Sequence, residues 1–173
     1  KFEKPNFKGD YIEVIDTFYM NYLFFEDGLF VKNFWSSGPC DIIEKLEKIA
    51  LDTSEFYRSP FYNSFYWGKY YLSGDTIITQ SINNPAPPKV WAATEERFYI
   101  LDSNTIIQLS ERIMGRYPTY DIKRFEAEEK ERKYLPAVFV PVKILPESNS
   151  WLRQKEWFWY DKEDFNSWKK EQK

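Results

Sequence analysis

The chain has 173 residues, a net charge of −3 at neutral pH and no histidine. This length suits one domain with a full core, and we expect a single domain over residues 1–173. Acidic and basic residues are interspersed, so no basic field exists to hold a phosphate backbone, and we expect no nucleic-acid partner. The longest apolar runs fall far short of a membrane-spanning helix.

The absence of histidine narrows the chemistry that the chain can perform. Ser-His-Asp triads and most zinc sites require histidine, and the single cysteine, Cys40, has neither a histidine base nor a second cysteine to pair with. Paired carboxylates remain, and all lie in charged contexts typical of a solvated surface. These candidates are Glu95-Glu96, Glu128-Glu129 and the group Asp161, Glu163 and Asp164. We therefore expect no catalytic residue, no metal site and no cofactor.

In chain order, the first predicted hairpin runs from Tyr19 to Trp35. Its reversal is at Asp27-Gly28, a pair that readily supplies the positive φ angles of a type I′ turn. Tyr22 and Phe24 fall on one face of the first strand, and the residues that alternate with them are also apolar. Both faces of this hairpin are therefore expected to be covered.

Residues 41–50 predict a short amphipathic helix. Apolar residues recur at helical spacing, charged residues take the opposite side, and Asp41 is a candidate cap. We expect this helix to pack on the outside of the sheet or to plug one end of it, with partner binding as the alternative. We expect the ring-rich stretch 52–66 to form either another strand or a flap over a cavity mouth.

A pattern used twice predicts two further hairpins. Residues 71–78 (Tyr-Leu-Ser-Gly-Asp-Thr-Ile-Ile) are echoed by residues 100–107 (Ile-Leu-Asp-Ser-Asn-Thr-Ile-Ile), and a tryptophan, Trp67 or Trp91, precedes each copy. Turns are expected at 73–75 and 102–104, because their residues tolerate left-handed backbone or bond their own main chain. The proline-rich segment 83–88 cannot be a central strand.

The C-terminal part is less regular. Residues 121–133 carry mixed charges and predict a solvated hairpin tip or helix, whereas residues 137–142 predict a strand with Pro141 at an edge or bulge. Residues 157–160 predict a last strand, followed by a helix that Phe165 and Trp168 would pin to the body. The order favours an all-β, up-and-down antiparallel barrel of about eight strands, with a short amphipathic helix and a C-terminal helix.

Segments 67–78 and 98–107, together with 150–159, resemble the lipocalin-like domains of exported Bacteroidetes lipoproteins. This resemblance implies a calycin-type barrel that is exported to the periplasm, the outer membrane or the cell surface, with a lipid anchor possible in the precursor. The chain begins at Lys1 and not at Met, which indicates a processed or trimmed product, and a removed leader would fit this start.

Aromatic residues make up 20% of the chain, more than an ordinary core needs. Two functions follow from this surplus. In the first, a small apolar or amphipathic ligand binds inside the barrel among Tyr22, Phe24, Trp67, Tyr71, Trp91 and Tyr99. In the second, the rings fill the core, and residues 56–67 or the amphipathic helix contact a protein partner. We rank an enzyme last, because without histidine it must rely on carboxylates, Tyr, Lys or Ser; two buried carboxylates in a pocket that reaches solvent would favour it.

Overall fold

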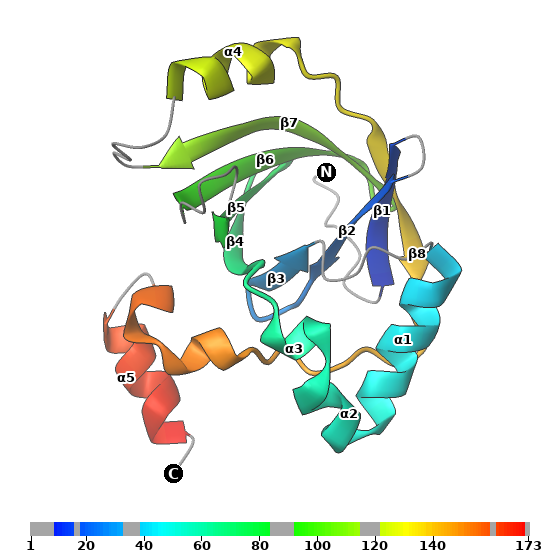
Figure 1. The fold of residues 1–173 in the computed structure, drawn as a ribbon, viewed down its shortest axis with the longest axis vertical. Helices are drawn as coiled ribbons and strands as arrows, with labels where there is room; N and C mark the ends of the chain where they lie inside the picture. Colours follow the sequence, from blue (N-terminus) through cyan, green and yellow to red (C-terminus); the bar gives the residue numbers. More distant parts are fainter. Residues whose placement is uncertain are drawn as a thin grey trace.

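The computed structural model describes residues 9–15, 18–32, 39–83, 92–114, 122–159 and 162–171. Its strands close into an antiparallel barrel in sequence order, because β8 pairs with β1 (Figure 1). The predicted fold class is therefore confirmed. The strands are β1 (Gly9–Ile15), β2 (Phe18–Phe24), β3 (Leu29–Lys32), β4 (Trp67–Ser73), β5 (Thr76–Asn83), β6 (Ala92–Asp102), β7 (Thr105–Met114) and β8 (Pro136–Pro141).

The three predicted hairpin turns lie where the sequence puts them. Gly28, between β2 and β3, has a φ of 82°, and Gly74, between β4 and β5, has a φ of 60°; both are backbone states that favour glycine. Between β6 and β7, the Asp102 carboxylate accepts a hydrogen bond from the amide of Asn104 at 2.8 Å. Local turn chemistry therefore determines these reversals.

Aromatic side chains pack against one another in one half of the barrel interior, which we call the ring half. The Tyr22 and Phe98 ring centroids are 5.0 Å apart, and Phe24 lies 5.9 Å from Phe30 and 6.2 Å from Phe98. These rings are fully buried or nearly so, and they occupy the space that the strands enclose. The buried members of this cluster are Tyr11, Tyr22, Phe24, Phe30, Ile77, Phe98, Ile100, Ile106 and Ala137.

A β-bulge in β7 decides which of its side chains enter the barrel. Arg97 pairs with Ser110, whereas the next residue, Phe98, pairs with Gln108, so Leu109 is an extra residue on β7. Leu109 is exposed. Because the register shifts here, Gln108 lies opposite inward-facing Phe98 and Glu111 lies opposite Glu96 on the same inner face.

A second apolar cluster, which we call the outer cluster, lies outside the barrel, under the helices α1 (Pro39–Leu51), α2 (Thr53–Arg58) and α3 (Pro60–Asn63). The apolar stripe of α1 is buried there against the outward-facing side chains of β2, β3 and β4. The predicted amphipathic helix is therefore confirmed, and it covers the outside of the barrel (Figure 1). It begins two residues earlier than predicted, so Asp41 lies in its first turn and does not cap it.

The ring-rich stretch 52–66 is neither a strand nor a flap, and those expectations were wrong. Asp52 caps α2 by accepting hydrogen bonds from the amides of Ser54 and Glu55. Ser59 then caps α3, which has Pro60 at its start. Phe56 and Phe61 are buried in the outer cluster, so two capped helical turns place these rings against the barrel wall.

The predicted last strand at 157–160 was also wrong. Residues 157 and 158 lie in the short 3-10 helix η2 (Glu156–Phe158), which follows η1 (Trp151–Gln154), and Tyr160 lies outside the described residues. The β1–β8 ladder already closes the barrel, so a ninth strand has no edge to join. Pro141 is the last residue of β8, at the end of that ladder, where its missing N–H is tolerated.

Two further helices lie outside the barrel. Of the two structures expected for residues 121–133, the helix is the one that forms. It is α4 (Ile122–Glu131), which lies against β7 (Figure 1). α5 (Lys162–Glu171) is the predicted C-terminal helix. Its Trp168 ring is 5.6 Å from Trp159, which attaches α5 to the segment before it. None of the helices in the described ranges has the length and apolarity to span a bilayer.

Candidate functional site

The structure places the described members of the predicted ligand set in different parts of the barrel. Tyr22 and Phe24 meet in the ring half, but Trp67 lies in the outer cluster, where its indole N–H donates to the carbonyl of Phe61 at 2.7 Å. Tyr71 and Tyr99 are 52% and 39% exposed. Trp91 lies outside the described residues. Side chains alternate between the two faces of β4, so Trp67 and Tyr71 lie on the same face as Lys69, which points outward. They therefore face away from the barrel interior.

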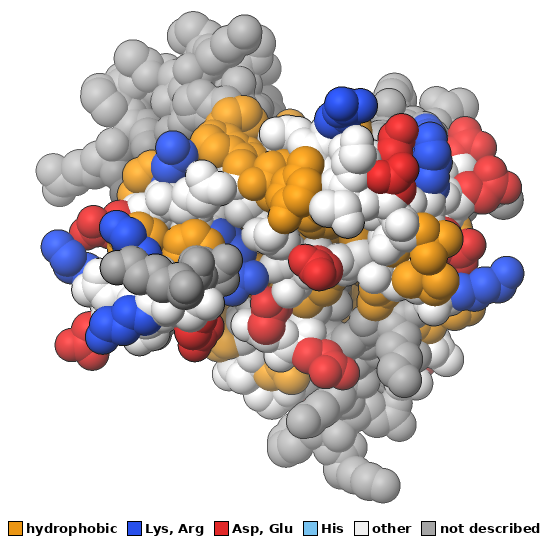
Figure 2. Space-filling model, turned by 90° about the horizontal axis from the view of Figure 1, so that it is seen from below, with side chains coloured by type: hydrophobic (Ala, Val, Ile, Leu, Met, Phe, Trp, Pro, Cys, Tyr) orange, Lys and Arg blue, Asp and Glu red, His pale blue; other side chains and the backbone are white. Residues whose placement is uncertain are grey.

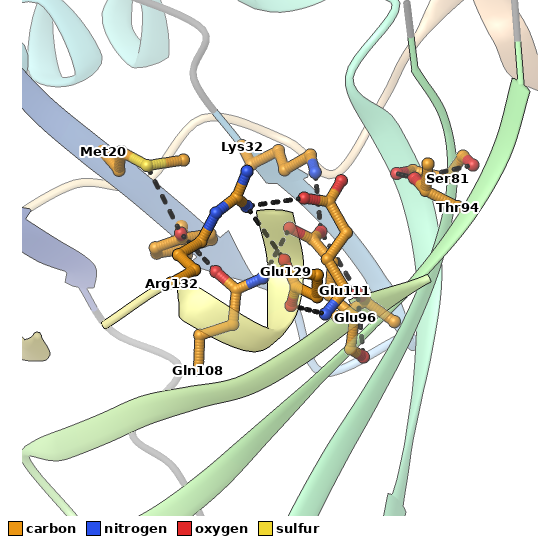
Figure 3. A network of polar contacts seen from close by, with 11 residues as sticks. Met20, Lys32, Ser81, Thr94, Glu96, Gln108, Glu111, Glu129 and Arg132 are labelled. Atoms are coloured by element: carbon orange, nitrogen blue, oxygen red, sulfur yellow. Dashed lines mark hydrogen bonds and ion pairs between the residues drawn. The ribbon is translucent and has the colours of Figure 1, made fainter. Parts of the chain in front are cut away.

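The other half of the interior is polar and contains a buried ion pair. The Lys32 ammonium lies 2.6 Å from the Glu96 carboxylate, and both side chains are 2% exposed (Figure 3). The Gln108 amide donates to the second oxygen of Glu96 at 3.3 Å, and the Thr79 hydroxyl donates to the first at 3.5 Å. Burial raises the pKa of Glu96, although the charge of Lys32 opposes this shift.

A second polar network joins α4 to β7. One Glu129 carboxylate oxygen accepts from the backbone amide of Glu111 at 2.6 Å and from the Tyr134 hydroxyl. Arg132 lies 3.1 Å from the Glu111 carboxylate and 3.4 Å from that of Glu129 (Figure 3). Burial and the Glu129 carboxylate raise the pKa of Tyr134, which therefore stays a neutral donor.

The expectation that the carboxylates are solvated was wrong for Glu95, Glu96 and Glu129. Glu95 and Glu96 are only 3% and 1% exposed, and Glu129 is half-buried. Strand parity was the missed signal, because Glu96 alternates inward with Phe98. Glu163 is exposed as expected, whereas Asp161 and the side chains of Glu128 and Asp164 lie outside the described residues.

The Glu95 side chain points to the outside of the barrel, where its carboxylate lies between two arginines. The Nε of Arg97 lies 3.1 Å from one carboxylate oxygen, and a terminal nitrogen of Arg112 lies 2.9 Å from the other. Burial acts to raise the pKa of Glu95, but the hydrogen bonds and charges of these arginines outweigh it, and the pKa is lowered. Each described buried carboxylate thus has a cationic partner, an arrangement that stabilises the ionised form.

A hollow of about 310 Å³ lies on the outer wall of the barrel, and we call it the outer cleft. On its floor, Ala93 of β6 pairs with Ile82 of β5 and Met114 of β7, which gives one apolar row. Lys69 and Gln80, paired across β4 and β5, form the adjacent outward row. The C-terminal segment supplies the opposing wall. The lining residues are Trp67, Gly68, Lys69, Gln80, Ser81, Ile82, Ala93, Met114, Trp157, Phe158 and Trp159.

The outer cleft combines exposed aromatic surface with positive charge. Trp157 is 55% exposed. The Lys69 ammonium lies 4.7 Å from the centroid of the Trp159 ring, and the guanidinium of Arg153 lies 5.6 Å from the same ring. The Trp159 indole N–H donates to the Arg153 carbonyl at 2.8 Å, which fixes the ring in place. The sequence did not indicate this site, because it requires residues 157–159 to dock on a distant sheet face.

A second, polar hollow of about 450 Å³ lies beside α5. Arg153 lines it, and its guanidinium donates to the carbonyl of Ser148 at 2.8 Å and lies 5.9 Å from the Trp168 ring. Neither this hollow nor the outer cleft is lined by Glu96, Glu111 or Glu129. Among the described residues, no group of three histidine, cysteine, aspartate or glutamate side chains is arranged to hold a metal ion.

The chain belongs, by its fold, to the closed eight-stranded antiparallel β-barrels. Comparison with protein-family models, with curated proteins and with solved structures finds no match for it. The lipocalin-like resemblance therefore continues to depend on the sequence segments that suggested it.

Proposed function

We propose that this chain is a non-catalytic binding protein that holds a small molecule in the outer cleft, with the barrel as a packed support. The observation that carries the proposal is the half-exposed Trp157 at a hollow whose floor is the apolar row Ile82, Ala93 and Met114. A volume of about 310 Å³ lies within the range of small-molecule sites, which are mostly apolar with a few polar groups.

The packing of the interior favours the cleft over the barrel as the ligand site. A ligand among Tyr22, Phe24 and Phe98 would have to displace rings whose centroids are already 5.0–6.2 Å apart and which are almost fully buried. Opening such a space would forfeit these contacts, at about 3–5 kcal/mol for each aromatic side chain removed from its site. Ligand binding inside the barrel, at the residues named from the sequence, stays a prediction.

A neutral, fluorescent apolar probe tests the proposal. N-phenyl-1-naphthylamine should bind with enhanced emission, and Trp157→Ala should weaken its binding about tenfold, because one stacked aromatic face is lost. Tyr71→Ala is the matched control, since Tyr71 is similarly exposed (52% against 55%) and lies outside the cleft lining. Equal losses in the two variants, or no binding by the wild-type chain, would contradict the proposal.

The alternative function, a module that binds a protein through residues 56–67 or α1, also stays a prediction. Phe56, Phe61 and Trp67 are used for packing in the outer cluster. Tyr57 and Leu51 are 48% and 72% exposed. Seen from the side of α2 and α5, the surface has charged residues of both signs interspersed with hydrophobic ones (Figure 2). This mixture does not single out a partner surface.

We further propose, on the resemblance to exported lipoproteins, that the precursor is exported and lipid-anchored. The test is to express the gene with its natural start in a bacterial host and to label it with radioactive palmitate. Labelled protein in the membrane fraction that loses its label on Cys→Ser substitution in the leader would agree with the proposal. Unlabelled protein that stays in the cytoplasm would contradict it.

A further inference from the structure

Large apolar side chains lie exposed on the outside of the barrel where β6, β7 and β8 run side by side. Tyr99 alternates with inward-facing Phe98 and pairs with Ile107, which in turn pairs with Pro136. The next outward row contains the pair Thr105 and Val138. We call this surface the β6–β8 face, and its apolar members are Tyr99, Leu101, Ile107, Leu109, Pro136 and Val138.

The apolar area of this face is close to what a stable interface needs. Leu101, Leu109 and Val138 are 51–53% exposed, and Tyr99 is 39% exposed. With the two other members they expose on the order of 400 Å² of apolar surface, a size at which a patch indicates a contact site. A standard interface buries about 800 Å² on each partner, of which a little over half is apolar. The β6–β8 face therefore supplies the apolar share of one such interface.

β6 carries an exposed charge of opposite sign at each border of this face. Arg97, in the outward row before Tyr99, is 47% exposed and donates from its Nε to Glu95 at 3.1 Å. Asp102, at the hairpin tip, is exposed and accepts from the amide of Asn104. The row of Tyr99, which lies between these two charges, is uncharged. A second copy of this face turned end to end therefore presents a cation where the first presents a carboxylate.

The other described charges around the face are compatible with this end-to-end orientation. Asp75, whose carbonyl accepts from the amide of Ile100, adds to the acidic tip. Arg112 binds the second oxygen of Glu95, so the end at Arg97 has two arginines for one carboxylate. The exposed residues just before β8 have both signs: Lys130, Glu131, Lys133 and an Arg132 that is paired with Glu111 and Glu129. Antiparallel strands would bring opposite charges of β6 together, whereas parallel strands would bring like charges together.

We propose that the β6–β8 face binds a second copy of this chain, in a two-fold dimer whose axis crosses β6 near Tyr99 at right angles to the strands. Arg97 of each copy then lies opposite Asp102 of the other. These two residues are five positions apart on one strand, so an axis midway between them passes beside Tyr99. The outer cleft stays open in both copies, because Ala93 is six residues from Tyr99 along β6, about 20 Å away.

The oligomeric state of the whole chain, measured by sedimentation equilibrium, tests the proposal. At about 100 µM the wild type should be mainly dimeric. Leu109→Glu should raise the dimer dissociation constant at least about tenfold, because two-fold symmetry removes the same apolar contact twice. Val138→Glu, at another exposed position of the face, should act in the same direction.

Leu51→Glu is the matched control, because Leu51 is 72% exposed at the end of α1 and lies outside the face. It should leave the dissociation constant unchanged. A monomeric wild type at about 100 µM, or equal effects of Leu109→Glu and Leu51→Glu, would overturn the proposal. A monomer that binds neutral phosphatidylcholine vesicles, and loses that binding in Leu109→Glu, would assign the face to a bilayer and likewise overturn the dimer.

A double-substitution cycle tests the orientation of the two copies. Arg97→Gln and Asp102→Asn each remove one charge, and asparagine keeps an acceptor for the amide of Asn104. Each single substitution should raise the dissociation constant about threefold, because it removes two symmetric, solvent-accessible ion pairs. The double variant should raise it no further than either single substitution. Additive losses, or no loss in either single variant, would overturn the antiparallel arrangement.

Discussion

At the scale of single residues, we expect the stability of the protein to be most sensitive to changes in the buried Lys32–Glu96 pair. Both groups are 2% exposed, so removing one partner leaves the other charge buried. We expect Glu96→Gln to lower the free energy of unfolding by about 3–5 kcal/mol, and the double variant Lys32→Met/Glu96→Gln to recover most of that loss. Urea unfolding measures both. A double variant no more stable than Glu96→Gln would contradict this account.

The same pair predicts a pH dependence for Lys32→Met. Without Lys32, the largest influence that lowers the pKa of Glu96 is lost, burial acts against a weaker opposition, and the pKa rises further. A carboxyl group whose pKa is raised on folding contributes stability at low pH, and this contribution is lost as the pH rises through the folded-state pKa. Lys32→Met should therefore destabilise the protein more at pH 8 than at pH 5. A loss that does not change with pH would argue against a buried Glu96.

Glu95 has the opposite dependence. Because its pKa lies below the usual value of 4.5, its contribution is present at neutral pH and is lost as the pH falls below about 4.5 towards the folded-state pKa. Glu95→Gln should cost about 1 kcal/mol or less at pH 7, since both arginines are largely exposed. Between pH 5 and pH 3 its stability should fall less steeply than that of the wild type, and parallel curves would count against the arginine contacts.

Glycine is required at position 68 because there is no room for a side chain, and not because of its backbone angles. A Cβ at this position would lie 2.2 Å from the carbonyl oxygen of Gln80 and 2.5 Å from the Phe30 ring. We expect Gly68→Ala to lower the free energy of unfolding by at least about 2 kcal/mol. Gly28→Asn is the control for steric contact, because its Cβ meets nothing closer than 3.5 Å and the change adds only the backbone strain of a φ of 82°. Similar melting temperatures for Gly68→Ala and the wild type would refute this close contact.

At the scale of secondary-structure elements, α4 is held to β7 by Glu129. Its carboxylate accepts from the amide of Glu111, so Glu129→Ala leaves that amide without this partner. Hydrogen exchange at the Glu111 amide should speed up about tenfold, while the amides of β5 keep their protection. Glu126→Ala, an exposed change on the same helix, should have no effect. Unchanged exchange in Glu129→Ala would mean that α4 docks by other contacts.

The sequence predicted those elements whose determinants are local. Asp27-Gly28 and the turn at 102–104 define their hairpins through backbone chemistry alone. The caps Asp52 and Ser59 were equally local signals for α2 and α3, but the density of rings obscured them. The strand expected at 157–160 failed for a tertiary reason, because β1 and β8 had already closed the sheet.

At the scale of the whole molecule, the barrel order was predictable and the candidate site was not. Up-and-down pairing follows from consecutive hairpins, and it was confirmed through to the β1–β8 closure. Strand parity from Phe30 and Phe98 would have placed Lys32 and Glu96 inside. No local pattern places Trp157 near Ile82 of β5 and Ala93 of β6, because these residues lie more than sixty positions earlier in the chain.

The central claim is that the barrel interior is packed and that the ligand binds in the outer cleft. A ¹H–¹⁵N correlation titration with 8-anilino-1-naphthalenesulfonate tests it most directly. We predict shifts at the amides of Lys69, Gln80 and Ala93 and at the Trp157 indole, which line the outer cleft. The amides of Tyr22 and Phe98 in the ring half should not move. Shifts concentrated at Tyr22 and Phe98, with the cleft unaffected, would place the ligand inside the barrel and contradict the account.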